Sequence, residues 1–566
     1  MMNPEELDLH TKSIGPMPVI NHFIHRLHLY EILARRIPEA SRHGLSSAEC
    51  IGILVRNILV SREPIYGMGE WADKYPCELL GLSPEKRGHV NDDRIGRSLE
   101  RLFDADRASL LTEIVVSAVK EFDLSMKRFH NDSTSVALSG MYRKATGKDM
   151  RMKKTVNLTF GPSKEHRSDL KQLVWILTVT GDGSVPVHYT VADGNTSDSP
   201  THIETWESIH RLTDRSDFMY VADSKLCTIE NMMYINDHRG RFITVLPATR
   251  SEHNMFRNWL QDHPDPWTVT VHGKRDERGN VWKIMESPIP SSDGFRIVWA
   301  WSSQKARHDK EIRDGIMRNS IMNLERLETK LRSKRCRIHT HEDVEKAARN
   351  ATGNGARWVG FTITEDIIEV RRQISRGRPS ASTEYRSMER KRFHVGWKPM
   401  VDNIDFDEAC DGIFPLITND VKISLKDVLS SYKYQPHVEK RHEQMKSVYG
   451  VAPVLLKNVD RIEGLLFVYF LALLMESLIE REIRNSMKNE GRNSIQIYPE
   501  FRPCQSPTTD RVLDAFSMVQ MHWVEAGGKI IKKFLPELTE RQKELLSLAG
   551  VPEESYHRDW NAVPGG

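Results

Sequence analysis

The chain has 566 residues, of which 81 are Lys or Arg and 78 are Asp or Glu, so its formal net charge is +3 at pH 7. Apolar residues make up 39% and charged residues 28%, a composition typical of a soluble globular protein that excludes a disordered or collagen-like chain. The length predicts about three to five domains of roughly 100–200 residues each. The small net charge does not exclude a nucleic-acid partner, because the sum can hide local basic segments.

The cysteines and the most apolar segment indicate a soluble, intracellular protein. The six cysteines include no Cys-x2-Cys pair, which argues against a zinc ribbon and fits a reducing cytoplasm. The first ten residues, MMNPEELDLH, lack the basic start and apolar core of a signal peptide. The apolar run 464–475, GLLFVYFLALLM, is too short to span about 30 Å of hydrocarbon as a helix, so it predicts a buried core helix and no membrane partner.

The first 122 residues are predicted to form an all-helical N-terminal domain. Apolar residues recur at helical spacing in the segments 20–37, 48–60, 95–103 and 110–122. Ser46 or Ser47 can cap the second of these helices, and Asn91 can cap the third. The domain could bind DNA through a helix-turn-helix or be a plain helical bundle, and the pattern favours neither.

Beyond Asp123 the pattern predicts a mixed α/β sheet, in which three strands precede alternating helices and strands. The expected elements are strands 129–132, 173–180 and 185–191, helix 201–212, strand 218–223, helix 229–235 and strand 242–246. The hairpin between the second and third strands turns through Gly181-Asp182-Gly183.

The segment 250–410 is irregular and partly β. Strand-like pieces at 267–271, 295–301 and 358–363 accompany a helix near 312–331. A strand at 412–418, which could belong to this segment or to the sheet, precedes a strongly helical stretch that ends near 488. The remaining residues, 489–566, are predicted to form a small helical region.

Two segments are strongly basic. Residues 371–400 contain nine Lys or Arg and two Glu, and residues 141–172 contain nine Lys or Arg and three acidic residues. Such segments are expected where phosphate backbones bind, although a solvated basic loop gives the same pattern. Arg376-Gly377-Arg378-Pro379 has the sequence of an AT-hook core, whose arginines can enter a narrow A·T-rich minor groove. An exposed basic loop is the alternative.

Two aspartates are predicted to end strands of the sheet. Asp132 ends the run KRFHND, and Asp223 ends the run FMYVAD. If the two strands are neighbours, the carboxylates could share a hard cation such as Mg²⁺, which prefers oxygen ligands. The alternative is that each Asp only caps the turn that follows it.

A third carboxylate is predicted on a helix that begins at Pro436, in the segment YKYQPHVEKRHEQMK (432–446). Glu439 falls in its first turn, and Lys446 lies two turns later on the same face. That face would present a carboxylate for a metal and an ammonium for a phosphate. Glu443 is the competing carboxylate, and an amphipathic helix with solvated charges is the alternative.

Together these residues resemble the acidic triad of DDE transposases. Tyr432-x2-Gln435-x3-Glu439-x6-Lys446 is similar to the Tyr-x2-Arg-x3-Glu-x6-Lys signature of the IS-four superfamily of bacterial and archaeal insertion sequences. Further segments resemble its IS-sixteen-thirty-four branch, namely 161–172, 191–198, 221–232 and 461–482. Gln435 departs from the signature, because the Arg and its charge are absent.

The resemblance implies an RNase H-like catalytic core interrupted by an insertion domain. Asp132 and Asp223 are 91 positions apart, whereas Asp223 and Glu439 are 216 apart, which leaves room for that insertion. The implied organisation is given by the segments 1–122 (helical domain), 123–249 (first part of the core), 250–410 (insertion domain), 411–488 (second part of the core) and 489–566 (C-terminal region).

The resemblance also implies the chemistry. Asp132, Asp223 and Glu439 would hold two divalent cations, Mg²⁺ or Mn²⁺, with Asp132 touching both. Tyr432, Gln435 and Lys446 would contact DNA phosphates, and Arg376 and Arg378 are further candidates for DNA binding. The partners would be double-stranded DNA, at terminal inverted repeats and at the target, and a second copy of the chain in a synaptic complex.

Other residues are weaker candidates. His166, Arg167, Asp169 and Gln172 lie in a segment that resembles the family near its active site, and we expect structural or DNA-positioning roles there. The DNA hairpin intermediate of similar enzymes requires an extruded base stacked on an aromatic ring. The candidates for that ring, each of which could instead be a core residue, are Trp282, Trp299, Trp301 and Trp397.

The leading hypothesis is a cut-and-paste transposase that acts in the cytoplasm at the nucleoid. The alternatives are a catalytically inactive or domesticated DNA-binding derivative, and a Mg²⁺-dependent nuclease that cleaves strands without joining them. The presence of all three acids argues against an inactive derivative, and Gln435 is the one residue that argues for it.

Overall fold

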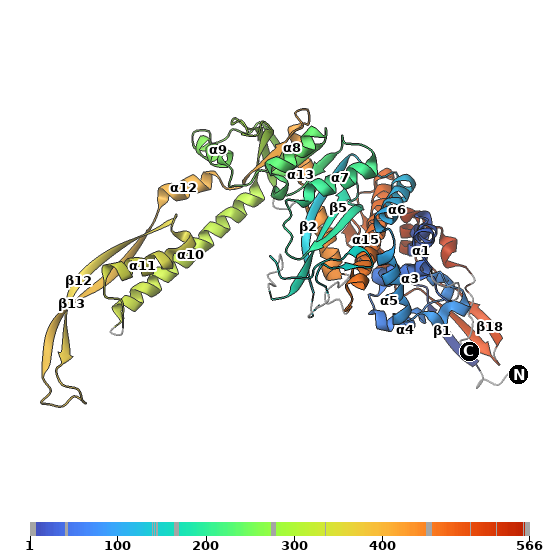
Figure 1. Cartoon of the computed structure of the whole chain (residues 1–566), viewed down its shortest axis with the longest axis horizontal. Helices are drawn as coiled ribbons and strands as arrows, with labels where there is room; N and C mark the ends of the chain where they lie inside the picture. Colours follow the sequence, from blue (N-terminus) through green and yellow to red (C-terminus); the bar gives the residue numbers. More distant parts are fainter. Residues whose placement is uncertain are drawn as a thin grey trace. The chain divides into compact units, whose positions relative to one another are not determined.

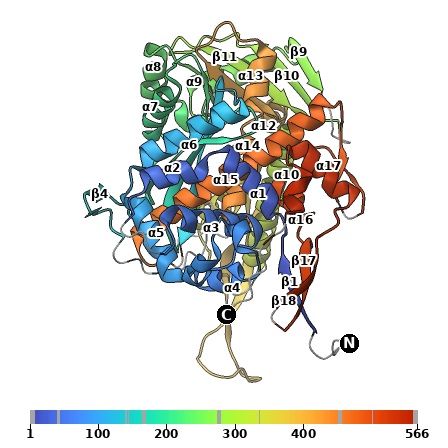
Figure 2. The same cartoon turned by 90° about the vertical axis from the view of Figure 1, so that its right-hand side faces the viewer.

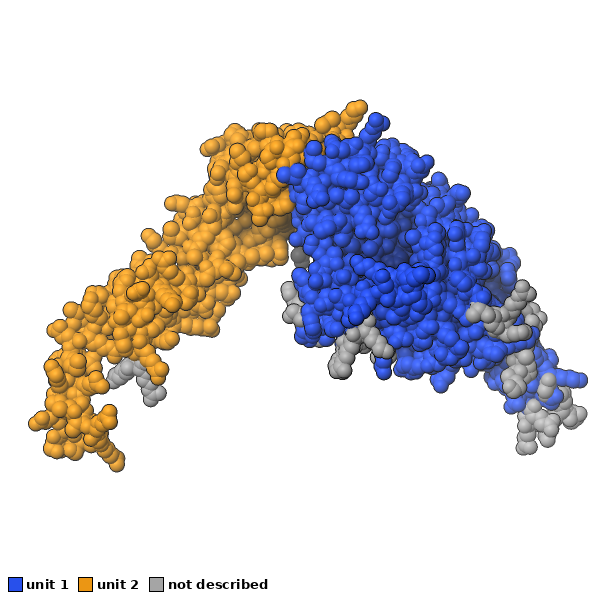
Figure 3. Space-filling model, in the orientation of Figure 1, with its two compact units in different colours: residues 1–244, 430–566 blue, residues 245–429 orange. Residues whose placement is uncertain are grey.

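The structure is a computed structural model. It describes residues 7–39, 44–138, 140, 142, 145–162, 169–272, 279–333, 336–448, 456–498, 500–527, 529–558 and 560. The chain divides into two compact units, distinguished by colour in Figure 3. Unit 1 contains residues 1–244 and 430–566, and unit 2 contains residues 245–429.

The N-terminal part of unit 1 is mainly helical. Its helices are α1 (Met17–Arg26), α2 (Leu29–Arg36), α3 (Ser47–Val60), α4 (Met68–Ala72), α5 (Asp92–Asp104) and α6 (Arg107–Phe122). Ser46 and Glu49 form a complete capping box at the start of α3, and the Asn91 side chain caps α5, as the sequence predicts. The predicted helix 20–37 is divided in two because His28 adopts a left-handed backbone conformation.

The terminal regions are not purely helical, which corrects the prediction. Strand β1 (Leu7–Ser13) pairs antiparallel with β17 (Gln520–Ala526), which in turn pairs with β18 (Lys529–Phe534). Figure 2 shows this small sheet beside the helices of unit 1. Strands β1 and β17 are about 500 residues apart in the chain, so their pairing leaves no local signal in the sequence. The C-terminal helices are α16 (Thr509–Asp514) and α17 (Glu540–Ala549), and a short pair of strands, β15 (Ile495–Gln496) and β16 (Pro503–Cys504), precedes them.

A mixed sheet forms the centre of unit 1, with strand order β6-β5-β2-β7-β8. Its strands are β2 (Arg128–Leu138), β5 (Lys171–Thr180), β6 (Pro186–Asp193), β7 (Met219–Val221) and β8 (Arg241–Val245). The β2–β5 and β5–β6 pairs are antiparallel, whereas β2–β7 and β7–β8 are parallel. Helices α7 (Thr201–Thr213) and α8 (Ile229–Asp237) connect the later strands, and the two-residue strands β3 (Asp149–Met150) and β4 (Lys153–Lys154) form a small hairpin.

Strand β2 is longer than predicted, so Asp132 does not end it. The strand continues to Leu138, and Ser133, Thr134 and Ser135 pair with β5 and are buried. In the sequence these polar residues indicate a turn, but in the structure they lie in the middle of a sheet. Asp132 is therefore held on both sides by regular strand.

Helix α15 (Val459–Asn489) is the buried core helix of unit 1, as predicted. It is long and apolar enough to pass a test for a membrane span, yet its apolar segment is fully buried within the protein. The helix packs against α1, α3, α5, α16, α17 and strand β6 (Figure 2). The N-terminal helices, the sheet and the C-terminal helices of unit 1 therefore share one core.

Charged residues of α15 are also buried, and each contacts another segment. Glu463 accepts hydrogen bonds from Arg107 (2.9 Å) and from the backbone N–H of Val156 (2.8 Å). Arg481 donates to the carbonyl oxygens of Phe122 (2.8 Å) and Asp123 (3.1 Å). Because buried charges are tolerated only when paired, these contacts fix where the neighbouring segments dock.

Unit 2 contains its own strands and helices. Four strands are ordered β14-β11-β10-β9, and a separate pair is formed by β12 and β13. The elements are α9 (Ser251–Gln261), β9 (Val269–His272), β10 (Val281–Glu286), β11 (Arg296–Ser302), α10 (Ser303–Arg332), α11 (His341–Thr352), β12 (Val359–Gln373), β13 (Tyr385–Pro399), α12 (Val401–Ala409) and β14 (Ile413–Thr418), followed by α13 (Leu425–Tyr432) at the boundary with unit 1. Strand β10 was not predicted, and β12 and β13 extend far beyond the predicted piece 358–363.

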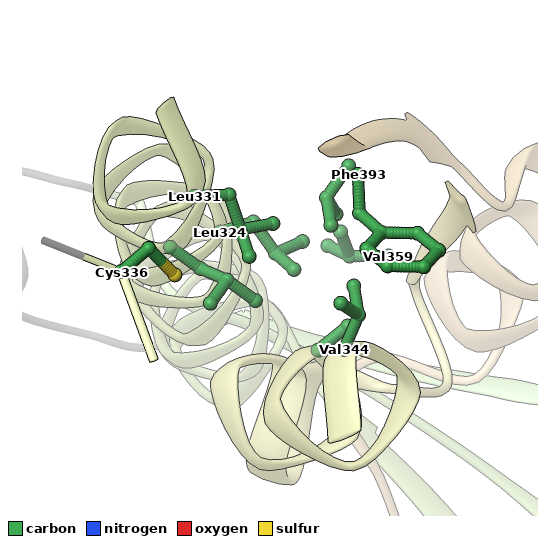
Figure 4. Packing of buried hydrophobic residues seen from close by; sticks show 9 residues of the cluster. Leu324, Leu331, Cys336, Val344, Val359 and Phe393 are labelled. Carbon is green, nitrogen blue, oxygen red and sulfur yellow. The ribbon is translucent and has the colours of Figure 1, made fainter. Parts of the chain in front are cut away.

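A small hydrophobic cluster anchors the base of the β12–β13 hairpin. Val359, Phe393 and Val395 of the hairpin pack against Leu324 of α10 and Val344 of α11 (Figure 4). Beyond this cluster the two strands continue away from α10 and α11, as Figure 1 shows. The base of the hairpin is therefore fixed by packing, whereas its outer half has no hydrophobic core.

Two buried histidines of unit 1 make its stability depend on pH. Burial lowers the pKa of His130 to about 3 and that of His202 to about 4. Below pH ~6.5 the unfolded chain binds protons that the folded chain does not. The contribution of each neutral histidine to stability is therefore fully present above that pH and is lost as the pH falls towards the pKa of the folded protein. Each histidine contributes a loss of ~1.4 kcal/mol per pH unit.

We expect the free energy of unfolding to fall between pH 6.5 and pH 5 by about 2 kcal/mol for each of these histidines. Urea unfolding at several pH values measures it. A His202→Gln variant has no titrating ring at this position. The slope of its unfolding free energy against pH should therefore be smaller than that of the wild type by the contribution of one proton. An unchanged slope would show that His202 is protonated in the folded protein.

Candidate active site

Strands β2 and β7 are parallel neighbours; Asp132 lies within β2, and Asp223 lies two residues beyond the end of β7. In the β2–β7 ladder His130 is paired with Val221, and each aspartate follows two residues later on its own chain. Side chains two residues apart on a strand point to the same face. The condition that the two strands are neighbours is met, and the two aspartates lie at the same level, each two residues beyond the last paired residues of the β2–β7 ladder.

Asp223 also caps the turn that follows its strand. Its Oδ1 accepts a hydrogen bond from the backbone N–H of Lys225 (3.0 Å), at the start of the short 3-10 helix Ser224–Leu226. Capping and metal binding are not exclusive, because an ionised carboxylate has two oxygens and about four lone pairs. The capping bond fixes the orientation of the carboxylate at the end of β7.

Helix α14 (Pro436–Glu443) begins at Pro436 as predicted and packs on strand β2. Gln435, directly before it, is 7% exposed; its Nε2 donates to the carbonyl oxygen of Asn131 (2.7 Å), and its Oε1 lies 3.2 Å from Nδ1 of His130. One turn beyond Glu439, Nε2 of His442 lies 3.6 Å from Oδ2 of Asp132. Gln435 before Glu439 and His442 after it thus contact β2 between His130 and Asp132.

Glu439 and Asp223 both lie near Tyr432. Burial raises the pKa of the Tyr432 phenol, and the negative charges of Asp223 and Glu439 raise it further. Tyr432 therefore stays a neutral phenol that can donate a hydrogen bond near both carboxylates. The predicted triad thus comes from β2, the end of β7 and α14, all within unit 1.

Lys446 does not lie on a continuing α-helix, which corrects the predicted geometry. Residues Gln444–Val448 form a π-helical turn after α14. A π-turn has more residues per turn than an α-helix, so seven residues after Glu439 no longer corresponds to the same face. Such turns are frequent at functional sites.

Arg441 anchors the opposite side of α14. Its buried guanidinium donates to Glu480 of α15 (2.9 Å), and to the carbonyl oxygens of Gly183 (3.3 Å) and Ser184 (3.2 Å) in the β5–β6 turn. Gln435 and His442 on one side and Arg441 on the other thus fix the position of Glu439 relative to the sheet.

The donor chemistry of the three acids fits a divalent cation that prefers oxygen ligands, such as Mg²⁺ or Mn²⁺. Their backbones converge from two adjacent strands and one docked helix. Among the residues that the structure describes, however, no three side chains of His, Cys, Asp or Glu are grouped closely enough to hold a metal ion. The predicted ligand set therefore stays a prediction.

Several other predicted residues are now placed. Arg376 and Arg378 lie in unit 2, in the connection between β12 and β13, and both are exposed. His166 and Arg167 lie outside the described residues. Gln172 is buried, and its Nε2 donates to the carbonyl oxygens of Gly194 (2.7 Å) and Pro162 (3.2 Å), so it contributes to structure as expected.

The tryptophans proposed for base stacking differ in exposure. Trp299 is fully buried and stacks on Phe256, with ring centroids 3.7 Å apart, so it is a core residue. Trp397 packs against the hydrophobic cluster at the base of the β12–β13 hairpin. Trp301 donates from Nε1 to the carbonyl oxygen of Asp411 (2.9 Å).

The basic segment 141–172 is partly used inside the protein. Arg151 pairs with Asp460 of α15 (2.9 Å), and Lys153 donates to the carbonyl oxygen of Phe103 (3.1 Å). Four of its cations, Arg143, Lys144, Lys164 and Arg167, lie outside the described residues. The local charge of this segment therefore overstates the charge it presents to a ligand.

Sequence reasoning missed His130, His442 and Arg441. His442 is three residues after Glu439, and that spacing places both on one helix face, which was a usable signal. The contact of His130 with Gln435 and the pairing of Arg441 with Glu480 depend on tertiary packing and left no local pattern.

Comparisons with known proteins give a partial family match and weak structural similarity. Residues 9–116 match a family model described as a domain of unknown function, DUF4277. No curated protein matches the chain. A structure of piggyBac transposase in a synaptic complex with hairpin DNA aligns with a TM-score of 0.36 and 8% identity, covering 89% of this chain and 78% of that chain.

A Mos1 transposase paired-end complex with the left transposon end aligns with a TM-score of 0.14 and 12% identity, covering 38% of this chain and 63% of that chain. A pre-cleavage Mos1 transpososome aligns with a TM-score of 0.14 and 11% identity, covering 42% of this chain and 80% of that chain. These similarities are too weak to assign a function.

We expect Arg441→Leu to lower the free energy of unfolding by about 3 kcal/mol, because it leaves the buried Glu480 without its closest cation. Urea unfolding measures the change. Lys440→Leu, at the exposed neighbouring position, is the matched control and should change stability by less than ~0.5 kcal/mol. Equal effects of the two substitutions would contradict the anchoring role of Arg441.

Gln435→Arg, which introduces the residue of the signature that the sequence resembles, should destabilise the protein. It places a guanidinium among buried groups, next to the neutral His130, at a cost of ~3 kcal/mol. Thermal unfolding measures the change, and Lys433→Arg, at an exposed position, is the control. A variant as stable as the wild type would show that position 435 can present a charge to solvent.

Proposed function

We propose that the chain is a DDE-type transposase that cleaves and joins DNA strands at the ends of an insertion sequence, using Asp132, Asp223 and Glu439 as its acidic triad. The observation that carries the proposal is that Asp132 and Asp223 each lie two residues beyond the last paired residues of the adjacent parallel strands β2 and β7, with the Glu439 helix docked on β2. The strand order β6-β5-β2-β7-β8 supports an RNase H-like core, because three antiparallel strands precede two parallel ones.

The reaction has two kinds of step on a phosphodiester. In cleavage, a water oxygen bonds to phosphorus, the bond to the 3′-oxygen breaks, and that oxygen leaves as a hydroxyl. In joining, the oxygen of a 3′-hydroxyl bonds to phosphorus in place of water and loses its proton. The bond from that phosphorus to its own 3′-oxygen breaks, and the departing oxygen takes up a proton. Forming a DNA hairpin intermediate would follow the same exchange. Bound divalent cations would supply charge stabilisation to the attacking and leaving oxygens.

The residues of the chain have distinct roles in this proposal. Asp132, Asp223 and Glu439 would hold the two cations. Tyr432, kept neutral by burial and by the two nearby carboxylates, would donate its hydroxyl hydrogen to a phosphate oxygen. Lys446 would pair with a second phosphate. Gln435 would hold α14 against β2 and would not contact DNA.

The partners and the alternatives follow from the same proposal. The substrates would be double-stranded terminal inverted repeats and target DNA, with two copies of the chain bridging two ends. A nuclease without joining activity would give the cleavage products alone, and an inactive derivative would give neither product. Terminal inverted repeats on either side of the coding sequence would support the transposase over both alternatives.

Asp132→Asn, Asp223→Asn and Glu439→Gln should each reduce cleavage of end-containing DNA by roughly 100-fold or more, because each removes several kcal/mol of transition-state stabilisation. Mn²⁺ should raise the melting temperature of the wild type, and the same variants should lose that increase. Gel analysis of labelled DNA and thermal unfolding with and without Mn²⁺ measure the two effects.

Glu443→Gln is the matched control. Glu443 is an exposed carboxylate on the same helix, one turn after Glu439, and its removal should leave both cleavage and the Mn²⁺ effect unchanged. Cleavage that persists in the Asp132, Asp223 and Glu439 variants, or that is lost equally in Glu443→Gln, would overturn the triad.

A further inference from the structure

The β12–β13 hairpin of unit 2 carries much of the basic segment 371–400 on an exposed, two-stranded element. Each strand has 15 residues, and they pair in unbroken antiparallel register from Val359–Pro399 to Gln373–Tyr385. In the outer half most side chains on both faces are exposed, including Ile367, which is 67% exposed. An isolated two-stranded hairpin is only marginally stable in water. The contribution of the outer half to folding therefore does not explain why the chain contains it.

The register sorts the charges onto two different faces. Directly paired residues share a face, and successive residues alternate between faces. One face, here called the basic face, carries the cations Arg372, Arg386, Arg390, Arg392 and Lys398 and one acid, Asp366. The other face is balanced, because Arg371 and Lys391 share it with Glu365, Glu369 and Glu389. The net charge of the segment is therefore concentrated on one side.

The outer end of the basic face contains a like-charge pair. Arg372 lies directly opposite Arg386, an arrangement that destabilises a strand pair. The adjoining connection adds the exposed Arg376 and Arg378. Folding alone would not favour these cations side by side, whereas a row of phosphates would neutralise them.

We propose that the basic face of the β12–β13 hairpin lies along the phosphate backbone of double-stranded DNA, and that Arg376 and Arg378 at its tip enter the minor groove. The outer eight residues of each strand extend roughly 25 Å, enough to follow several phosphates, and a two-stranded ribbon is narrow enough to lie in a DNA groove. The proposal rests on the proposed function only in taking duplex DNA as the substrate.

The test measures binding of the full chain to a short DNA duplex of arbitrary sequence, in EDTA, as a function of salt concentration. Arg372→Gln/Arg386→Gln should weaken binding and reduce the slope of log K against log salt by roughly 2. Arg371→Gln/Lys391→Gln, which removes the same charge from the balanced face, should leave the slope close to the wild-type value. Equal slopes for the two variants, or unchanged binding in the first, would overturn the proposal.

The tip is tested with A·T-rich and G·C-rich duplexes. The wild type should prefer the A·T-rich duplex, and Arg376→Gln/Arg378→Gln should lose that preference. Equal affinity of the wild type for both duplexes would reject insertion into the minor groove. Binding to single-stranded DNA that depends equally on the basic face would reject the duplex as its ligand.

A second variant separates binding from folding of the hairpin. Arg386→Glu places a carboxylate opposite Arg372 and creates an attractive cross-strand pair. Amide exchange in the hairpin should become slower while DNA affinity falls. Faster exchange together with lost affinity would assign the loss to unfolding and overturn the proposal. Because these assays need no cleavage, their outcome is independent of the triad.

Discussion

The burial of α15 is the constraint on which unit 1 depends. Its apolar length must be covered on all sides, which draws helices from both ends of the chain and strand β6 onto one core. Its buried charges then determine how each neighbour docks, since an unpaired buried charge costs several kcal/mol. Glu463 fixes α6, Arg481 fixes the end of α6, and Glu480 fixes α14.

The candidate active site follows from that arrangement. The hydrogen-bonded register of β2 and β7 sets the two aspartates at one level, and no side-chain contact is needed to do so. Helix α14 is held between the sheet and α15 by Gln435 on one side and Arg441 on the other. Glu439 lies between these anchors, so its backbone is fixed while its side chain stays exposed. That combination of fixed backbone and exposed side chain is what the proposed role of Glu439, holding a cation beside a DNA phosphate, would need.

The sequence predicted the elements whose signals are local. The helices 48–60, 95–103 and 110–122, the capping box at Ser46 and the helix start at Pro436 were correct because each depends on a few neighbouring residues. Strand β2 was cut short at Asp132 because Ser133 and its polar neighbours are buried only through pairing with β5. The β1–β17 pairing and the π-turn that contains Lys446 were missed because neither has a local signature.

At position 435 the spacing of the motif is kept, but the side chain and its charge differ from those of the signature. The signature that the sequence resembles has Arg there, and the resemblance placed Gln435, without that charge, among the residues expected to contact DNA phosphates. In the structure the side chain lies between Asn131 and His130, where burial keeps the imidazole neutral, so an uncharged amide is the residue that this site accommodates. The substitution is thus compatible with an intact site.

The net charge of +3 does not show how the charges are distributed over the protein. Composition counts charges, and the sequence locates them in segments, but only the strand register assigns them to faces. In segment 141–172 tertiary contacts consume part of the charge, since Arg151 and Lys153 bind inside the protein. In segment 371–400 the register concentrates it, since Arg372 and Arg386 meet across the hairpin. Two segments with similar counts therefore differ in structure, because two cations of the first contact other parts of the protein, whereas two cations of the second lie side by side on an exposed face.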